Sequence, residues 1–149
     1  MTLPDPGRFD SLDPDRADLW ARYGRPDRPL FVNLVGLRIA EVRVDYCRLV
    51  LPFRNELLQS GGAVHGGVVA TLIDTACVPA VGSGFTEARP YSTIDMHVQF
   101  QGNPGTSDLV AAAWVTRRGR SIVFCDAAVV TDDERAATVA SGRLTFKVS

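Results

Sequence analysis

The segment from Gln59 to Ala76, QSGGAVHGGVVATLIDTA, holds the densest group of residues that could perform chemistry. Two glycines, Gly66 and Gly67, follow His65 and open a predicted helix. Unpaired N–H groups and the positive end of the helix dipole meet at a helix N-terminus, where they can stabilise a developing oxyanion. Glycine has no Cβ, so a substrate carbonyl could approach this backbone closely. The same glycines would also allow close packing of the helix on a sheet, and the residues alone leave both interpretations open.

Asp74 is the one charged residue in this helix, which is otherwise apolar on nearly every side. A buried carboxylate without a partner is costly, so Asp74 is expected to have a partner, a raised pKa or a catalytic task. The alternative is that Asp74 lies on the one solvated stripe of the helix or pairs with an arginine.

His65 and Asp74 lie nine residues apart. In a helix this spacing points them to opposite sides and separates them by about 13 Å along the axis. One helix cannot easily bring both to a single substrate, which favours a dimer with shared active sites. A histidine at a helix start is more typical of a structural hydrogen bond than of a general base. His97 alternates within a predicted strand and is expected to be a surface or core residue.

The elements that must position these residues follow from side-chain periodicity. Apolar residues recur every three or four positions from Val64 to about Val81, which predicts a helix. Pro79 is expected to end or kink it, because proline lacks an N–H and clashes with the carbonyl four residues back. The Gly-Ser-Gly run at 82–84 is expected to terminate it.

Alternating apolar and polar residues predict strands on both sides of this helix. Residues 33–53 are interpreted as one long bent strand or a tight hairpin. A meander of antiparallel strands is expected after the helix, with a hairpin turn at Gly119, over residues 91–100, 107–118, 121–132 and 138–148. The fold class is therefore α+β, with a sheet that can wrap the helix.

Composition excludes several classes of function. A chain of 149 residues with a net charge of −1 and a pI of about 6.1 has no basic field to attract nucleic acid or an anionic membrane. No membrane-spanning run or signal peptide is evident, so we expect a cytoplasmic protein. Three scattered cysteines, Cys47, Cys77 and Cys125, lack metal-ligand spacing and are expected to be buried apolar residues.

Residues 1–30 form an acidic, proline-rich arm, expected to be partly irregular with a short helix near Leu19, Trp20 and Tyr23. Residues 31–149 are expected to form the main domain.

Three stretches resemble hotdog-fold thioesterases of the phenylacetate-pathway (PaaI-like) type: Gly62 to Ala76, STIDMHVQF at 92–100, and RRGRSIVFCDAAV at 117–129. The resemblance covers roughly residues 33–148 and does not account for the arm. It implies a curved antiparallel β-sheet wrapped around one long central helix, in dimers that often pair into tetramers. It also implies that no metal and no bound cofactor is needed.

The resemblance also implies roles for individual residues. The Gly66 amide would polarise the thioester carbonyl, and Asp74 would act as nucleophile or as general base toward water. The hydroxyl of Thr93, or alternatively of Ser92, would position the water or the carboxylate. Where many members carry asparagine, six residues before the motif histidine, this chain has Gln59, which can make the same hydrogen bonds at greater reach.

Arginines flank the turn at Gly119 and could hold the phosphates of coenzyme A; the alternative is a solvated basic turn. They are Arg117, Arg118 and Arg120. Taken together, we expect an acyl-CoA thioesterase acting on a small, medium or aryl acyl group. The leading alternative is a non-hydrolytic acyl-CoA or acyl-carrier binding protein on the same fold. Hydration of an enoyl thioester and a purely structural dimer are further alternatives.

Overall fold

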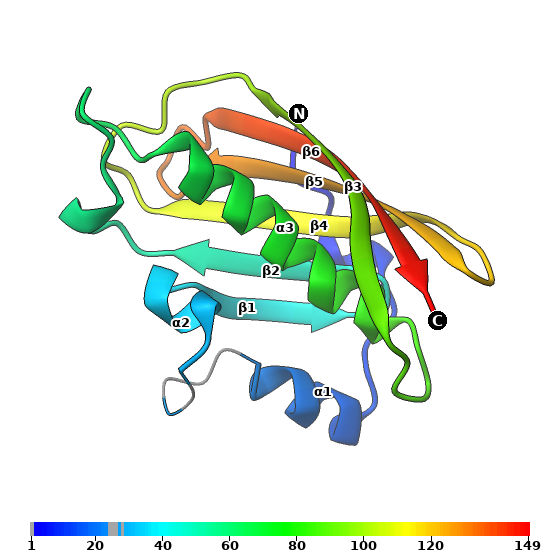
Figure 1. Cartoon of the computed structure of the whole chain (residues 1–149). Coiled ribbons are helices and arrows are strands. Elements are labelled where there is room, and N and C mark those ends of the chain that lie inside the picture. The colour runs from blue at the N-terminus through cyan, green and yellow to red at the C-terminus, as the bar shows by residue number, and fades with distance from the viewer. Residues whose placement is uncertain (1, 24–26, 28) are drawn as a thin grey trace.

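The structure is a computed structural model that describes residues 2–23, 27 and 29–149. Within these residues, six strands form one antiparallel sheet that curves around a long helix, α3 (Figure 1). The helical segments are η1 Pro6–Arg8, α1 Pro14–Ala21, α2 Phe31–Val35, η2 Asn55–Leu57 and α3 Gly66–Ser83. The strands are β1 Arg38–Arg43, β2 Tyr46–Leu51, β3 Tyr91–Phe100, β4 Leu109–Arg118, β5 Ile122–Thr131 and β6 Thr138–Val148. The prediction of an α+β fold with a sheet around one central helix is confirmed.

Helix α3 begins where the sequence predicts but does not end at Pro79. The helix continues to Ser83, with Gly84 as its C-cap, so only the predicted termination by the glycines is confirmed. Tertiary contacts explain why the last turn persists. Ala80 and Val81 are fully buried there. Arg118 donates a hydrogen bond to the Val81 carbonyl (2.8 Å), and its positive charge stabilises the negative end of the helix dipole.

The first two strands form the tight hairpin rather than one bent strand. β1 pairs with β2 from Arg38↔Val50 to Arg43↔Tyr46, and the turn places Asp45 at φ 62°, a left-handed conformation that aspartate tolerates. The last four strands lie close to the predicted residues.

The expectation of a simple meander after the helix is wrong for β3. The sheet order is β1-β2-β4-β5-β6-β3, so β3 pairs with β6 and not with β4. The loop after α3 leads into β3, which lies along β6 as an edge strand of the sheet (Figure 1). A shift in the β3–β6 register between Thr93 and Asp95 marks a bulge at Ile94.

The core lies between α3 and the concave face of the sheet. Small residues allow close approach: at Gly142 in β6, an added Cβ would lie 2.5 Å from Ile73 Cγ2 of the helix. The three cysteines are free and buried in this core, as predicted. By length and composition α3 could cross a membrane, but 61% of it is buried, which is typical of a core helix.

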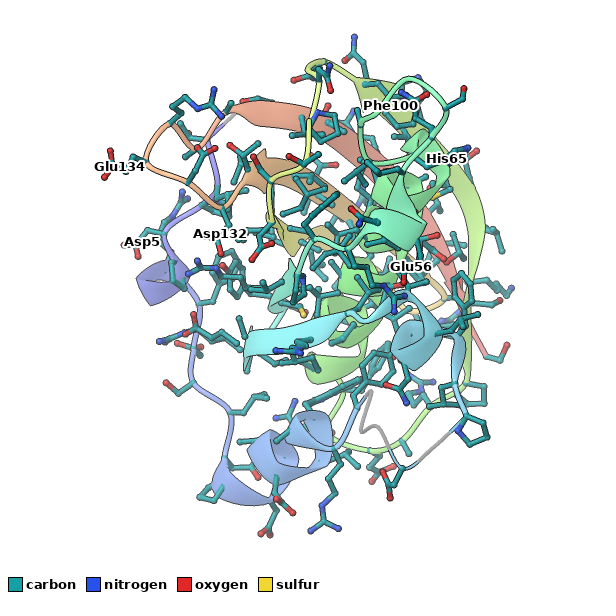
Figure 2. All side chains as sticks on the ribbon, turned by 90° about the vertical axis from the view of Figure 1, so that its left-hand side faces the viewer. Asp5, Glu56, His65, Phe100, Asp132 and Glu134 are labelled. Atoms are coloured by element: carbon teal, nitrogen blue, oxygen red, sulfur yellow. The ribbon has the colours of Figure 1, made fainter. Side chains whose placement is uncertain are left out.

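The N-terminal arm covers the opposite, outer face of the sheet (Figures 1 and 2). The Phe9 ring stacks on Tyr46 at 4.8 Å, and Val44 N–H donates to the Asp10 carbonyl (2.9 Å). The predicted short helix of the arm is α1, which begins with an Asp13 side-chain cap and Pro14. Residues 1, 24–26 and 28 of the arm lie outside the described residues.

Candidate active site

Asp74 and Thr93 come together between α3 and the edge strand β3. Asp74 is half-buried on the side of α3 that faces β3, and Thr93 Oγ1 donates a hydrogen bond to Asp74 Oδ1 at 3.0 Å. Among the described residues, no arginine, lysine or histidine forms an ion pair with Asp74. Ser92 is exposed at the preceding position of the strand. Of the two hydroxyls considered from the sequence, Thr93 is therefore the one at the carboxylate.

The N-terminus of α3 carries the second group of candidate residues. His65 is the N-cap, and its Nδ1 accepts a hydrogen bond from Gly67 N–H at 2.8 Å. This bond occupies the Gly67 amide and gives His65 a structural capping role. The Gly66 N–H takes part in none of the hydrogen bonds described for this chain, so it is the amide that remains for a ligand.

The ring of Phe100 lies directly over Gly66. A Cβ at position 66 would touch the ring, 3.4 Å from Cε1. Figure 2 shows Phe100 and His65 close together on one side of the molecule. The Gly66 end of the helix is therefore beside the end of β3, while Asp74 is beside its beginning.

The two halves of the site stay apart within one chain. Gly66 and Asp74 are eight residues apart in a continuous helix, which separates them by about 12 Å along the axis. Each half contacts a different end of β3, through Phe100 and Thr93 respectively.

Strand β3 itself is an uncovered edge. It has ten residues, contains no proline or lysine, and exposes large apolar side chains at Ile94 (57%), Met96 (44%) and Phe100 (57%). A long apolar edge of this kind offers unpaired backbone groups to another strand, and soluble proteins usually protect such edges.

Gln59 belongs to the Gly66 half of the site. Its Oε1 accepts a hydrogen bond from Gly61 N–H at 2.6 Å, and its backbone bonds to Gly62 and Ala63. The side chain thus stabilises the loop that leads into the helix.

The three arginines of the β4–β5 turn differ in their surroundings. Arg118 pairs with Asp45, donates to the Val81 carbonyl and lies 4.6 Å from the Phe85 ring centroid, so it fastens the C-terminal end of α3. Arg117 and Arg120 are exposed. Only these two present a guanidinium free of described ion pairs at this turn.

Aromatic residues near Asp74 were not found from the sequence. The pKa of Tyr23, which follows α1, is raised mainly by burial and further by the charges of Cys47 and Asp74. Burial raises the pKa of Tyr91 to about 12, and the Tyr91 hydroxyl donates to the Val78 carbonyl at 2.9 Å. Tyr91 shares the strand face of Thr93, which alternation could have indicated. Tyr23 was expected only as part of the short helix of the arm, and no local pattern says which element that helix packs against.

Residues 61–138, just over half of the chain, match the family model of the thioesterase superfamily. The chain belongs to this superfamily, and its curved sheet around one helix is the hotdog fold. A candidate esterase of Halobacterium salinarum is 35% identical over 126 residues, which cover 78% of this chain and 83% of that protein.

Two solved structures are similar in fold. The PaaI protein of E. coli, from the phenylacetic acid degradation operon, has a TM-score of 0.77 at 19% identity and covers 89% of this chain and 93% of its own. The thioesterase HI1161 of Haemophilus influenzae has a TM-score of 0.77 at 21% identity, covering 85% and 87%. The family match and the esterase name of the Halobacterium relative support a hydrolase that acts on thioesters.

Proposed function

We propose that this protein is an acyl-CoA thioesterase that hydrolyses a small, medium or aryl acyl-CoA to the free acid and coenzyme A. The observation that carries the proposal is the Thr93–Asp74 hydrogen bond, 3.0 Å long, at one end of an edge strand whose other end lies beside the free amide of Gly66.

The proposed site is completed by a second copy of the chain. Antiparallel pairing of β3 with the same strand of a partner would place the beginning of one strand beside the end of the other. Asp74 and Thr93 of one subunit would then face Gly66 and Phe100 of the partner subunit, and the exposed apolar residues of β3 would be buried. The dimer, and its pairing into a tetramer, are part of the proposal.

In the proposed reaction, the Gly66 amide and the helix dipole hold the carbonyl oxygen as it becomes negative. Asp74 removes a proton from water, which attacks the carbonyl carbon; the carbon–sulfur bond breaks, and the thiolate of coenzyme A takes up the proton. Thr93 holds the carboxylate through Oδ1. The alternative is direct attack by Asp74, and oxygen-18 from solvent would enter Asp74 in a single turnover only on that route.

Arg117 and Arg120 are proposed to bind the phosphates of coenzyme A, because they are exposed and neither forms an ion pair among the described residues. Arg118 is left out of this proposal, since it already pairs with Asp45 and bonds to the end of α3.

We propose that neither a metal nor a cofactor takes part. In the described residues, no three side chains of His, Cys, Asp or Glu gather into a possible metal site. A cytoplasmic location is also proposed, since three free buried cysteines suit a reducing compartment, and cell fractionation would check it.

The test uses a panel of acyl-CoA substrates with a thiol reagent, in the presence of EDTA. Wild-type protein should release coenzyme A, and Asp74→Asn should lower kcat by orders of magnitude without changing the thermal unfolding temperature much. Near-full activity of the variant would overturn the role of Asp74. Tight binding of acyl-CoA to the wild type without turnover would instead favour the non-hydrolytic binding protein.

A further inference from the structure

The face of α3 that carries Asp74 continues toward the C-terminal end of the helix as a line of contacts. Asp74, Val78 and Gly82 follow one another at four-residue intervals, about one turn each. Asp74 bonds to Thr93, and the Val78 carbonyl accepts a hydrogen bond from Tyr91, two residues earlier on β3. A group extending from Asp74 along this face meets Tyr91 next.

At Gly82, the last residue of this line, α3 is covered by Trp20 of the N-terminal arm. An added Cβ there would collide with the Tyr91 hydroxyl and would lie 2.5 Å from Cζ2 of Trp20, so the two aromatic side chains meet over the helix backbone. Only glycine leaves them this room. Arg16, on the same helix α1 as Trp20, donates to the Ser83 carbonyl and fastens α1 to the end of α3.

Tyr23 extends this group of aromatic side chains. Its ring packs edge-on against Trp20 with centroids 5.9 Å apart. Burial is the main cause that raises the pKa of Tyr23, and the charges of Cys47 and Asp74 add to the rise. Tyr23 in turn contributes to the raised pKa of Tyr91.

A cavity of about 230 Å³ lies beside Trp20 and Gly82. Its walls include Leu19 and Trp20 of α1, Gly82, Phe85 and Tyr91. Complete ligand sites usually measure about 300–1,000 Å³, so this cavity is the size of part of a ligand. The Trp20 ring both contacts Gly82 and lines the cavity.

We propose that Trp20, together with Tyr23 and Tyr91, forms the end wall of the acyl pocket and limits the substrate to small, medium and aryl acyl groups. The inference rests on the proposed thioesterase function and assigns the arm a role in it. Aromatic rings stack well on an aryl group, while the wall stops a long alkyl chain about 12 Å from Asp74, the length of two helical turns. Removing the Trp20 ring would extend this cavity along the face of α3 that carries Gly82, Val78 and Asp74.

The test compares Trp20→Ala with Leu34→Ala, an exposed leucine (72%) of α2 that is neither among the walls of the cavity nor among the residues that meet Gly82. For each variant, kcat/KM is measured on phenylacetyl-CoA and on straight-chain acyl-CoAs from acetyl to palmitoyl. Trp20→Ala should raise the ratio of palmitoyl-CoA to phenylacetyl-CoA by roughly tenfold or more, the size of effect expected when pocket volume changes. Leu34→Ala should leave the profile unchanged. An unchanged profile in Trp20→Ala, or the same shift in Leu34→Ala, would overturn the proposal.

A binding measurement separates this proposal from the proposed function. Calorimetric binding of the same acyl-CoAs to chains that carry Asp74→Asn does not depend on turnover. Addition of Trp20→Ala should tighten binding of the long acyl-CoAs; equal affinities with and without it would overturn the end wall whether or not the chain is a thioesterase. Trp20→Leu, which keeps an apolar contact, serves the same comparison if Trp20→Ala does not fold.

Discussion

Single atoms define each half of the proposed site. Oδ1 of Asp74 is held by Thr93, and among the described residues none donates to Oδ2, which is therefore the oxygen proposed to act on water. At the helix start, the His65 ring occupies the Gly67 amide and leaves that of Gly66. In the proposed site, the motif histidine therefore acts by engaging the Gly67 amide, which leaves the Gly66 amide for the substrate.

At the residue scale, Gly66→Pro should remove the proposed oxyanion donor without disturbing the helix. Gly66 is the first helical residue, where proline is favoured, and His65 already has the extended backbone (φ −63°, ψ 136°) that precedes a proline. Steady-state kinetics should show kcat lowered by roughly 10²–10³, the usual cost of losing one such donor.

The matched control is Gly66→Ala, which keeps the N–H and brings a methyl group to 3.4 Å from the Phe100 ring. It should retain far more activity than Gly66→Pro at a similar unfolding temperature. Equal kcat values for the two variants would remove the Gly66 amide from the mechanism.

At the scale of the element, β3 connects the two halves of the proposed site, the one at Asp74 and the one at Gly66. It lies at the edge because it pairs with β6, and it exposes three large apolar residues. Its first half contacts Asp74 and its end covers Gly66. The same strand is thus the proposed interface and the element that supports both halves of the site.

A lysine at Met96 should weaken the proposed pairing of β3 strands, because it would bury an unpaired charge in an apolar interface. Sedimentation should show a larger monomer fraction, with kcat at low protein concentration lowered in proportion. Gln99→Lys, at an exposed polar position of the same strand, is the control and should remain assembled. A Met96→Lys monomer with full activity would contradict a shared site.

At the scale of the whole molecule, the two faces of the sheet are covered by different parts of the chain. The concave face holds α3, while the arm covers the outer face through Phe9 and Tyr46 and then brings α1 against the end of α3. The arm is therefore joined to the fold at both faces, and its removal would expose the outer face as well as the proposed acyl pocket.

Mixing two inactive proteins tests the shared site directly. After exchange of subunits between Asp74→Asn and Gly66→Pro, each mixed dimer would hold one site with an intact Gly66 and an intact Asp74. Random exchange should restore about a quarter of the wild-type activity per site, as expected for a two-fold dimer. If both residues of a site came from one chain, every site would stay defective and no activity would return.

The sequence by itself determined the elements and the main candidates. Periodicity is local, so it predicted α3 and the last four strands, and the lone Asp74 in an apolar helix was visible without coordinates. The pairing of Thr93 with Asp74 came from the family resemblance, since no local pattern specifies which strand lies beside a helix.

Only the tertiary structure decided the rest. The place of β3 at the edge depends on where the chain re-enters the sheet, which no spacing encodes. Pro79 did not end α3, because buried neighbours and Arg118 stabilise the turn beyond it. The contact of Trp20 with Gly82 joins helix α1 of the arm to a helix some sixty residues later, and such long-range packing is determined by the shapes and burial of both partners together.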